Sequence, residues 1–93
     1  MISEQQKFTI KQILAPFNPK SIGIFGSVAR GEATPDSDLD ILVEFTKNYS
    51  LFDLVELEDQ LAEALHRKID LVTERSLHPF IKPYIEKDII FLD

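Results

Sequence analysis

The sequence contains no cysteine and few positive charges. Without cysteine the chain forms no disulfide bond and performs no thiolate chemistry, which is compatible with a reducing compartment. Ten Lys and Arg residues stand against 16 Asp and Glu residues, and the formal net charge is −6. Direct nucleic-acid binding through a basic surface is therefore not expected, nor is adhesion to an anionic membrane. A divalent cation or a partner protein with a basic face fits this charge better.

Long apolar runs are also absent. No segment approaches the ~20 apolar residues that a membrane-spanning helix needs, and the N-terminus lacks the charged and apolar regions of a signal peptide. We therefore expect a cytoplasmic protein. The 93 residues, of which 44% are hydrophobic, predict one globular domain over residues 1–93, with no second domain for recognising a substrate.

Helical and strand patterns alternate along the chain. Two capping boxes, Ser3 with Gln6 and Ser50 with Asp53, predict helix starts. Runs of β-branched and apolar residues predict strands. The predicted order is helix, strand, short helix, strand, helix, strand, helix and strand, with the strands at 21–25, 38–45, 68–73 and 88–92 and the short helix at 28–32.

Residues 74–87 allow two interpretations. Pro79 suits the first turn of a helix, whereas Pro83 would kink any helix that begins there. We expect a helix in this segment, with either proline compatible with its start.

Two aspartates stand at alternate positions at the start of the second strand. Successive side chains of a strand point to opposite faces, so Asp38 and Asp40 share one face, ~7 Å apart along the chain. Leu39 and Ile41 then point into a core. At an effective dielectric constant of about 20, two such charges repel by roughly 2 kcal/mol. A solvated strand face would tolerate them, but aspartate is a poor strand former, which favours a functional role.

A third carboxylate, Asp70, interrupts the next apolar strand between Ile69 and Leu71. If the two strands are neighbours, Asp70 stands beside Asp38 and Asp40, with no cationic side chain among the three. Convergent carboxylates suit a hard cation, Mg²⁺ or Mn²⁺, with substrate phosphates completing the coordination.

Gly26 and Ser27 lie between the first strand and the short helix. Glycine lets the backbone approach a ligand closely, and the free N–H groups of a helix start attract an anion such as phosphate. The pair is equally compatible with an ordinary turn and helix cap, and it is not a P-loop because no Gly-Lys-Ser/Thr follows a glycine-rich run. Arg30 either lies near the phosphates or pairs with Asp36 or Glu32.

Taken together, these residues match a known pattern. Gly26-Ser27, ten residues and then Asp38-x-Asp40 reproduce a Gly-Ser-x10-Asp-x-Asp signature. The string GSVARGEATPDSDLDILV resembles the minimal nucleotidyltransferase (MNT) branch of the DNA-polymerase-β-like nucleotidyltransferases. Asp70 falls where that family keeps its third carboxylate, and the resemblance extends over nearly the whole chain.

The resemblance implies an α+β fold, a small mixed, mainly antiparallel sheet flanked by helices that pack largely on one face. It also implies residue roles. The triphosphate of ATP would be bound by Gly26, Ser27 and Arg30. The catalytic residues, which would also bind two Mg²⁺ or Mn²⁺ ions, would be Asp38, Asp40 and Asp70. Asp70 would in addition help to deprotonate the attacking hydroxyl of an acceptor.

The implied activity is transfer of AMP from ATP to a protein hydroxyl. MNT proteins of this size are similar to antitoxins whose partner, encoded nearby, is a HEPN-type ribonuclease toxin, and a tyrosine of that toxin is the implied acceptor. Two alternatives stay open. The chain is a binding module that neutralises its partner by contact, or it modifies a small molecule. The complete set of carboxylates favours an enzyme, and each alternative is compatible with a homo- or hetero-oligomer.

Overall fold

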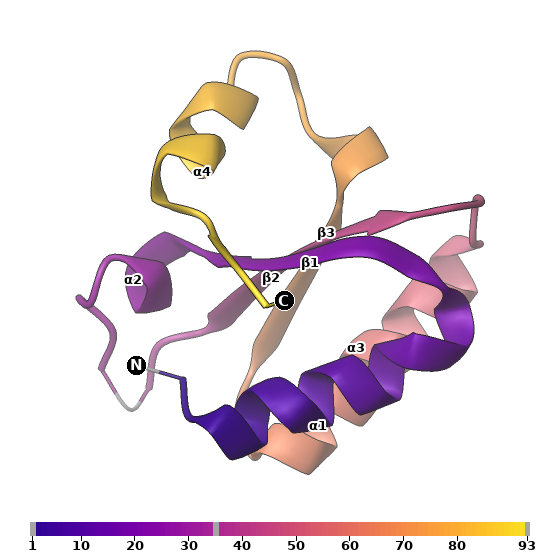
Figure 1. The fold of residues 1–93 in the computed structure, drawn as a ribbon, viewed down its shortest axis with the longest axis horizontal. Coiled ribbons are helices and arrows are strands. Elements are labelled where there is room, and N and C mark those ends of the chain that lie inside the picture. Colours follow the sequence, from indigo (N-terminus) through magenta and orange to yellow (C-terminus); the bar gives the residue numbers. More distant parts are fainter. Residues whose placement is uncertain (1, 35, 93) are drawn as a thin grey trace.

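The structure, a computed structural model, describes residues 2–34 and 36–92. Four strands form one sheet, and α1 (Glu4–Leu14) and α3 (Leu51–Leu65) lie side by side across one of its faces (Figure 1). The short helix α4 (Lys82–Asp88) lies on the other side of the sheet (Figure 1). None of the described helices is long and apolar enough to cross a membrane.

The strand order in the sheet is β3-β2-β1-β4. β1 pairs antiparallel with both β2 and β4, whereas β2 and β3 are parallel. A parallel pair needs a crossover connection, which α3 provides. The predicted mixed, mainly antiparallel sheet is therefore confirmed. The strand bounds are β1 (Pro19–Phe25), β2 (Leu39–Phe45), β3 (Ile69–Thr73) and β4 (Ile90–Phe91).

Both predicted capping boxes are present. Ser3 Oγ accepts a hydrogen bond from the N–H of Gln6 at 3.1 Å, and Gln6 Oε1 accepts one from the N–H of Ser3 at 2.8 Å. Ser50 and Asp53 make the same reciprocal pair at the start of α3. A cap of this kind stabilises a helix by about 1 kcal/mol, and it fixes the residue at which the helix begins.

β2 divides its side chains between two environments. Leu39, Ile41 and Val43 are at most 2% exposed and belong to the core that α1 and α3 cover. Burying each such side chain contributes about 1.5–3 kcal/mol. A slip of one residue would turn all of them outward, so the core fixes the register of β2 and, with it, the face from which Asp40 emerges.

Two elements begin earlier than predicted. β1 begins at Pro19, because a single residue separates it from the 3₁₀ turn η1 (Ala15–Phe17). This residue is Asn18, which has a left-handed conformation with φ 53°. The short helix α2 (Gly26–Ala29) begins at its glycine rather than at residue 28. Gly26 therefore belongs to the turn into the helix itself.

Residues 74–87 form a 3₁₀ turn, η2 (Glu74–Ser76), and then α4, which begins at Lys82. Pro83 lies in the first turn of α4, where the missing N–H has no intrahelical partner to lose. The expected kink is therefore wrong, because α4 starts at Lys82, directly before this proline, and not near Pro79. β4 confirms the short strand predicted at the end of the chain.

The second face of the sheet is covered only in part. Leu42, 6% exposed, is buried but lies outside the main core cluster, and α4 contacts β1. Ile89 lies so close over Gly23 that a Cβ atom at this glycine would overlap it. The parallel pair β2 and β3 brings Asp40 and Asp70 into register, and alternation places both on this face.

Candidate active site

Three segments that are distant in the sequence meet at one end of the sheet. Asp40 on β2 is aligned with Asp70 on β3 across the parallel pair. It is also aligned with Phe25 on β1 across the antiparallel pair. Gly26 follows Phe25 directly and starts α2. The predicted position of Asp70 is therefore confirmed for its neighbour Asp40, and Gly26 lies against the carboxylate of Asp40.

Gly26 is the residue at which only glycine fits. Its φ is +72°, in the left-handed region, and a Cβ atom built at this position would overlap the carboxylate of Asp40. The close approach brings the backbone at the start of α2 next to an aspartate side chain. A turn of this shape exposes backbone N–H groups that an anion can use.

Asp40 carries the clearest electrostatic perturbation of the site. Its pKa is raised to about 6, first by burial, then by the negative charges of Asp70 and Asp38 and by a hydrogen bond with Asp70. The Arg30 guanidinium acts against this shift. A carboxyl group perturbed by burial and by like charges is typical of functional sites. A bound cation would relieve the repulsion.

Asp38 lies directly before β2, which begins at Leu39 rather than at residue 38 as predicted. Its side chain is 44% exposed, and its Oδ2 atom is 3.9 Å from Nζ of Lys68. The expectation that no cationic side chain stands among the three aspartates is therefore wrong. Lys68 is 81% exposed, so the ion pair itself contributes little to stability. No local pattern in the sequence signals this contact, because Lys68 precedes β3 and is positioned by the left-handed turn at His66 that follows α3.

Ser27 and Arg30 flank the turn on α2. The backbone carbonyl of Ser27 accepts a hydrogen bond from the N–H of Glu32 at 2.9 Å, which closes the loop after the helix. Arg30 donates from Nε to Glu32 at 2.8 Å and lies 3.7 Å from Asp88 at the end of α4. The predicted pairing of Arg30 with Glu32 is confirmed, and its second partner is Asp88 rather than Asp36. Contact of Ser27 and Arg30 with a phosphate stays a prediction.

The carboxylates fit a divalent cation by their chemistry more than by their present arrangement. Within residues 2–34 and 36–92, no group of three or more His, Cys, Asp or Glu side chains is placed to hold an ion. Asp40 and Asp70 nevertheless offer oxygen ligands from adjacent strands in register. Mg²⁺ is usually bound by one or two carboxylates, with water and substrate phosphates in its other positions. The pair therefore fits this ion, and Asp38 is the additional candidate ligand.

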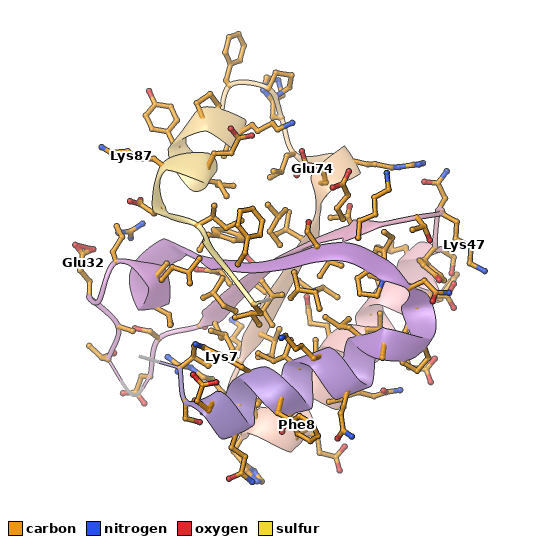
Figure 2. All side chains as sticks on the ribbon, viewed as in Figure 1. Lys7, Phe8, Glu32, Lys47, Glu74 and Lys87 are labelled. Carbon is orange, nitrogen blue, oxygen red and sulfur yellow. The ribbon has the colours of Figure 1, made fainter. Side chains whose placement is uncertain are left out.

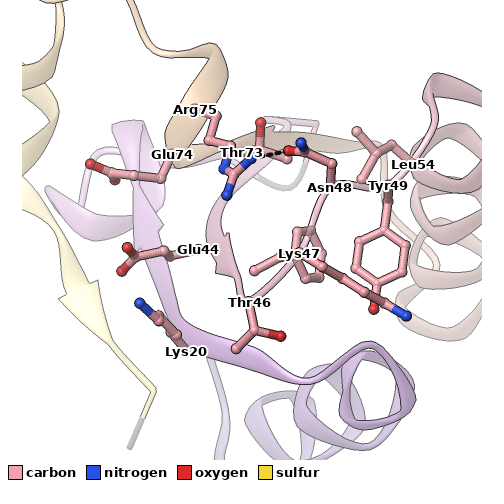
Figure 3. A pocket seen from close by; sticks show the side chains of 11 residues that line it. Lys20, Glu44, Thr46, Lys47, Asn48, Tyr49, Leu54, Thr73, Glu74 and Arg75 are labelled. Atoms are coloured by element: carbon pink, nitrogen blue, oxygen red, sulfur yellow. Dashed lines mark hydrogen bonds between the residues drawn. The ribbon is translucent and has the colours of Figure 1, made fainter.

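A separate cavity of about 160 Å³ lies at the opposite end of β2 (Figure 3). Figure 2 shows this separation, with Glu32 near α2 at one side of the molecule and Lys47, which lines the cavity, at the other. Small-molecule pockets usually measure about 300 Å³ or more, so this one is too small for a nucleotide. Two of its charged residues also have partners, since Glu74 pairs with Lys82 at 2.6 Å and Arg75 contacts Asn48.

The arrangement at the start of β2 defines a class of protein. A glycine turn suited to phosphate stands against carboxylates suited to the cation that accompanies a nucleoside triphosphate. A small mixed sheet with two helices on one face supports both. These are the parts of a nucleotidyltransferase.

Comparison with known proteins leads to the same class. The model of the nucleotidyltransferase domain family matches residues 7–92, and the chain belongs to this family. Protein MJ0126 of Methanocaldococcus jannaschii, provisionally named a protein adenylyltransferase, is 45% identical over 83 residues, which cover 88% of this chain and 85% of that protein. Protein adenylyltransferase MntA of Thermococcus cleftensis is 39% identical over 82 residues, covering 88% and 83%. A crystal structure of a toxin–antitoxin with AMP-PNP has a TM-score of 0.86 at 27% identity and covers 94% of this chain and 72% of that chain.

Proposed function

We propose that this protein transfers AMP from ATP to a hydroxyl group of a partner protein. The observation that carries the proposal is the contact of the Gly26 turn with Asp40, in register with Asp70. This contact joins a phosphate-binding element to the carboxylates that a nucleotidyl transfer needs. Relatives named as protein adenylyltransferases support the choice of AMP and of a protein acceptor, and AMP-PNP in a similar structure supports ATP as the donor.

Each residue of the site has a role in this proposal. Gly26 and Ser27 hold the triphosphate, and Arg30 balances its charge. The metal ligands are Asp38, Asp40 and Asp70. Two Mg²⁺ ions bound there, or Mn²⁺ in their place, would supply charge stabilisation for the attacking and leaving oxygens.

The chemistry is an in-line displacement at the α-phosphorus. The acceptor hydroxyl oxygen forms a bond to this phosphorus, and the bond from phosphorus to the β-phosphate oxygen breaks, so that pyrophosphate leaves. Asp70 takes part in removing the proton of the acceptor hydroxyl. It is exposed to solvent, as a group that meets an incoming protein must be.

A HEPN-type toxin encoded nearby, modified on a tyrosine, is the partner that we propose. The toxin–antitoxin with AMP-PNP supports a partner of this kind. The exposed position of Asp70 supports a protein over a small molecule, because the acceptor itself can cover the site and exclude water. A net charge of −6 favours a partner with basic residues around the modified hydroxyl.

Intact-mass measurement tests the proposal directly. The protein is mixed with ATP, Mg²⁺ and the neighbouring HEPN-type protein, and we expect mass gains in steps of one AMP on a partner tyrosine. Asp40→Ala should abolish these gains. A partner that stays unmodified, yet is inhibited equally by the wild type and by Asp40→Ala, would establish the binding module instead. Pyrophosphate release that requires a small hydroxyl compound and no partner would establish modification of a small molecule.

A further inference from the structure

Both peptide groups that flank Asp38 are held by one dipeptide on the neighbouring segment. The carbonyl of Ser37 accepts a hydrogen bond from Nε of Arg67 at 3.0 Å. The N–H of Leu39 donates to the carbonyl of Lys68 at 2.9 Å. The backbone on each side of Asp38 is thus fixed, although the aspartate side chain itself is partly exposed.

The Arg67 side chain also reaches further back along the loop. Its Nη2 atom is 3.5 Å from the carbonyl of Thr34, and the Nε atom holds Ser37 at the same time. Thr34 and Ser37 are joined to each other, since Thr34 N–H donates to Ser37 Oγ at 2.9 Å and Ser37 N–H donates to the Thr34 carbonyl at 3.0 Å. The guanidinium therefore docks a closed turn onto the start of β3. Arginine can do this because its donors form a rigid fork.

Arg67 stands just after the end of α3, where a cation is expected to interact with the helix. Positive side chains often interact with the last carbonyls of a helix. Here α3 ends at His66, which has a left-handed conformation with φ 53° and turns the chain away from the helix axis. The side-chain hydrogen bonds of Arg67 run to the loop before β2 instead. Stabilisation of the helix end does not account for this choice of acceptors.

We infer that Arg67 is a positioning residue for the nucleotidyl transfer proposed above, on which this inference rests. It sets the backbone of Asp38, and the dipeptide to which it belongs leads directly into β3 and Asp70. One short segment thereby places two of the three carboxylates relative to each other. Arg67 itself contacts neither nucleotide nor acceptor in this role. Its loss should change how the carboxylates bind a cation.

The test compares Arg67→Ala with a matched arginine variant. Arg75→Ala removes an exposed arginine whose contact, with Asn48, lies at the opposite end of the sheet. Mn²⁺ affinity is measured in the presence of AMP-PNP from the electron paramagnetic resonance signal of free Mn²⁺. Substitution of groups that orient metal ligands usually weakens metal binding about 10- to 100-fold, and we expect this loss for Arg67→Ala. Arg75→Ala should stay within about twofold of wild type, as exposed side chains usually do.

AMP transfer provides the second readout. Arg67→Ala should raise the Mg²⁺ concentration needed for half-maximal transfer while leaving KM for the partner protein unchanged. Arg67→Lys keeps the charge but replaces the rigid fork of donors with a single ammonium group on a flexible stem, so it should fall between the wild type and Arg67→Ala. If Arg67→Ala fails to fold, Arg67→Lys decides the question by the same two measurements.

The outcomes separate this inference from the proposed function. A lower melting temperature of Arg67→Ala with wild-type Mn²⁺ affinity would show that the residue is only structural and would overturn the inference. Wild-type protein that binds Mn²⁺ but transfers no AMP would remove the proposed function, while the Mn²⁺ affinities would still decide the role of Arg67. A wild type that binds no Mn²⁺ with AMP-PNP would contradict both.

Discussion

Along β2, the side chains that face α1 and α3 are almost completely buried, whereas the opposite face carries an aspartate whose pKa is raised to about 6. Burial of the apolar side chains on the first face stabilises the folded state. The charged carboxylate of Asp40 is instead destabilised, first by burial and then by repulsion from Asp70 and Asp38. The two faces belong to the same seven residues, so the arrangement that stabilises one face imposes unfavourable electrostatics on the other.

This contrast indicates how so small a chain keeps a charged cluster in place. The core residues fix the register of β2, and the position of Asp40 follows because it alternates with them. Stability and activity should therefore be separable by substitution. Changes on the core face should affect unfolding, and changes on the site face should affect chemistry with little loss of stability.

The largest effect should come from the site face. Asp70 is exposed, so Asp70→Asn should fold normally and lose AMP transfer by about 1000-fold, because loss of a metal ligand removes several kcal/mol of transition-state stabilisation. Asp59→Asn, which changes an exposed aspartate on α3, is the control and should be fully active. Rates are measured by AMP incorporation into the partner. Wild-type activity in Asp70→Asn would mean that another group is the third carboxylate.

The core face should respond in the opposite way. Leu61 on α3 is fully buried, and Leu61→Ala should lower the free energy of unfolding by about 2–5 kcal/mol. Leu51→Ala changes an exposed leucine on the same helix and should stay within about 0.5 kcal/mol of wild type. Urea titration gives both values. AMP transfer per folded molecule should be unchanged in each variant, and a selective loss of activity in Leu61→Ala would contradict the separation of the faces.

The glycine turn should affect both stability and AMP transfer. Substitutions at two glycines can separate its conformational strain from its contact with Asp40. Gly26 and Gly31 have almost equal φ values of +72° and +73°, but only at Gly26 would a Cβ atom overlap Asp40. The left-handed conformation costs a residue with a Cβ about 1–2 kcal/mol, and overpacking adds about 1–3 kcal/mol. Gly31→Ala should therefore show the conformational strain alone, and Gly26→Ala should show both together with loss of AMP transfer. If urea titration gives the same loss in free energy of unfolding for both variants, the Asp40 carboxylate moves aside without an energetic cost.

Much of this could be predicted from local patterns. Capping boxes predicted the helix starts at Ser3 and Ser50, and period-two alternation predicted which side of β2 enters the core. The resemblance of the Gly-Ser-x10-Asp-x-Asp string to the nucleotidyltransferase signature implied that Gly26 and Asp40 belong to one site. Each of these features depends on neighbours within a few residues or on a single strand pairing.

The remaining features depend on tertiary packing. Lys68 meets Asp38 because His66 turns the chain left-handed after α3, and no motif signals that conformation for histidine. Arg30 meets Asp88 because α4 packs next to α2. The raised pKa of Asp40 requires burial as well as sequence spacing. None of these contacts follows from a local pattern.

The smallest expected effect concerns the charge of Asp40, which is destabilised by burial and by repulsion from Asp70 and Asp38. Its pKa in the folded protein, about 6, lies above the ordinary value of 3.8, so the folded state binds this proton more tightly than the unfolded state. The resulting stabilisation is complete below about pH 4 and is lost as the pH rises through about 6. Asp40→Asn stays neutral throughout. In EDTA at pH 7 its melting temperature should therefore be higher than that of wild type. The free energy of unfolding should differ by an amount on the order of 1 kcal/mol, because solvent screening reduces the effect at this partly exposed group.

Melting curves between pH 4 and pH 7 measure this difference, and the sign should reverse with ligand. Mg²⁺ with AMP-PNP should raise the melting temperature of wild type but not that of Asp40→Asn, because a ligand stabilises only the folded state that binds it. Asp59→Asn should follow wild type in both conditions. If the melting temperatures of wild type and Asp40→Asn differ by a constant amount across this pH range, the charge of Asp40 does not destabilise the folded protein. If the difference changes with pH as expected, the negative charge that destabilises the metal-free protein is also the charge that binds the cation. One substitution should then remove both effects together.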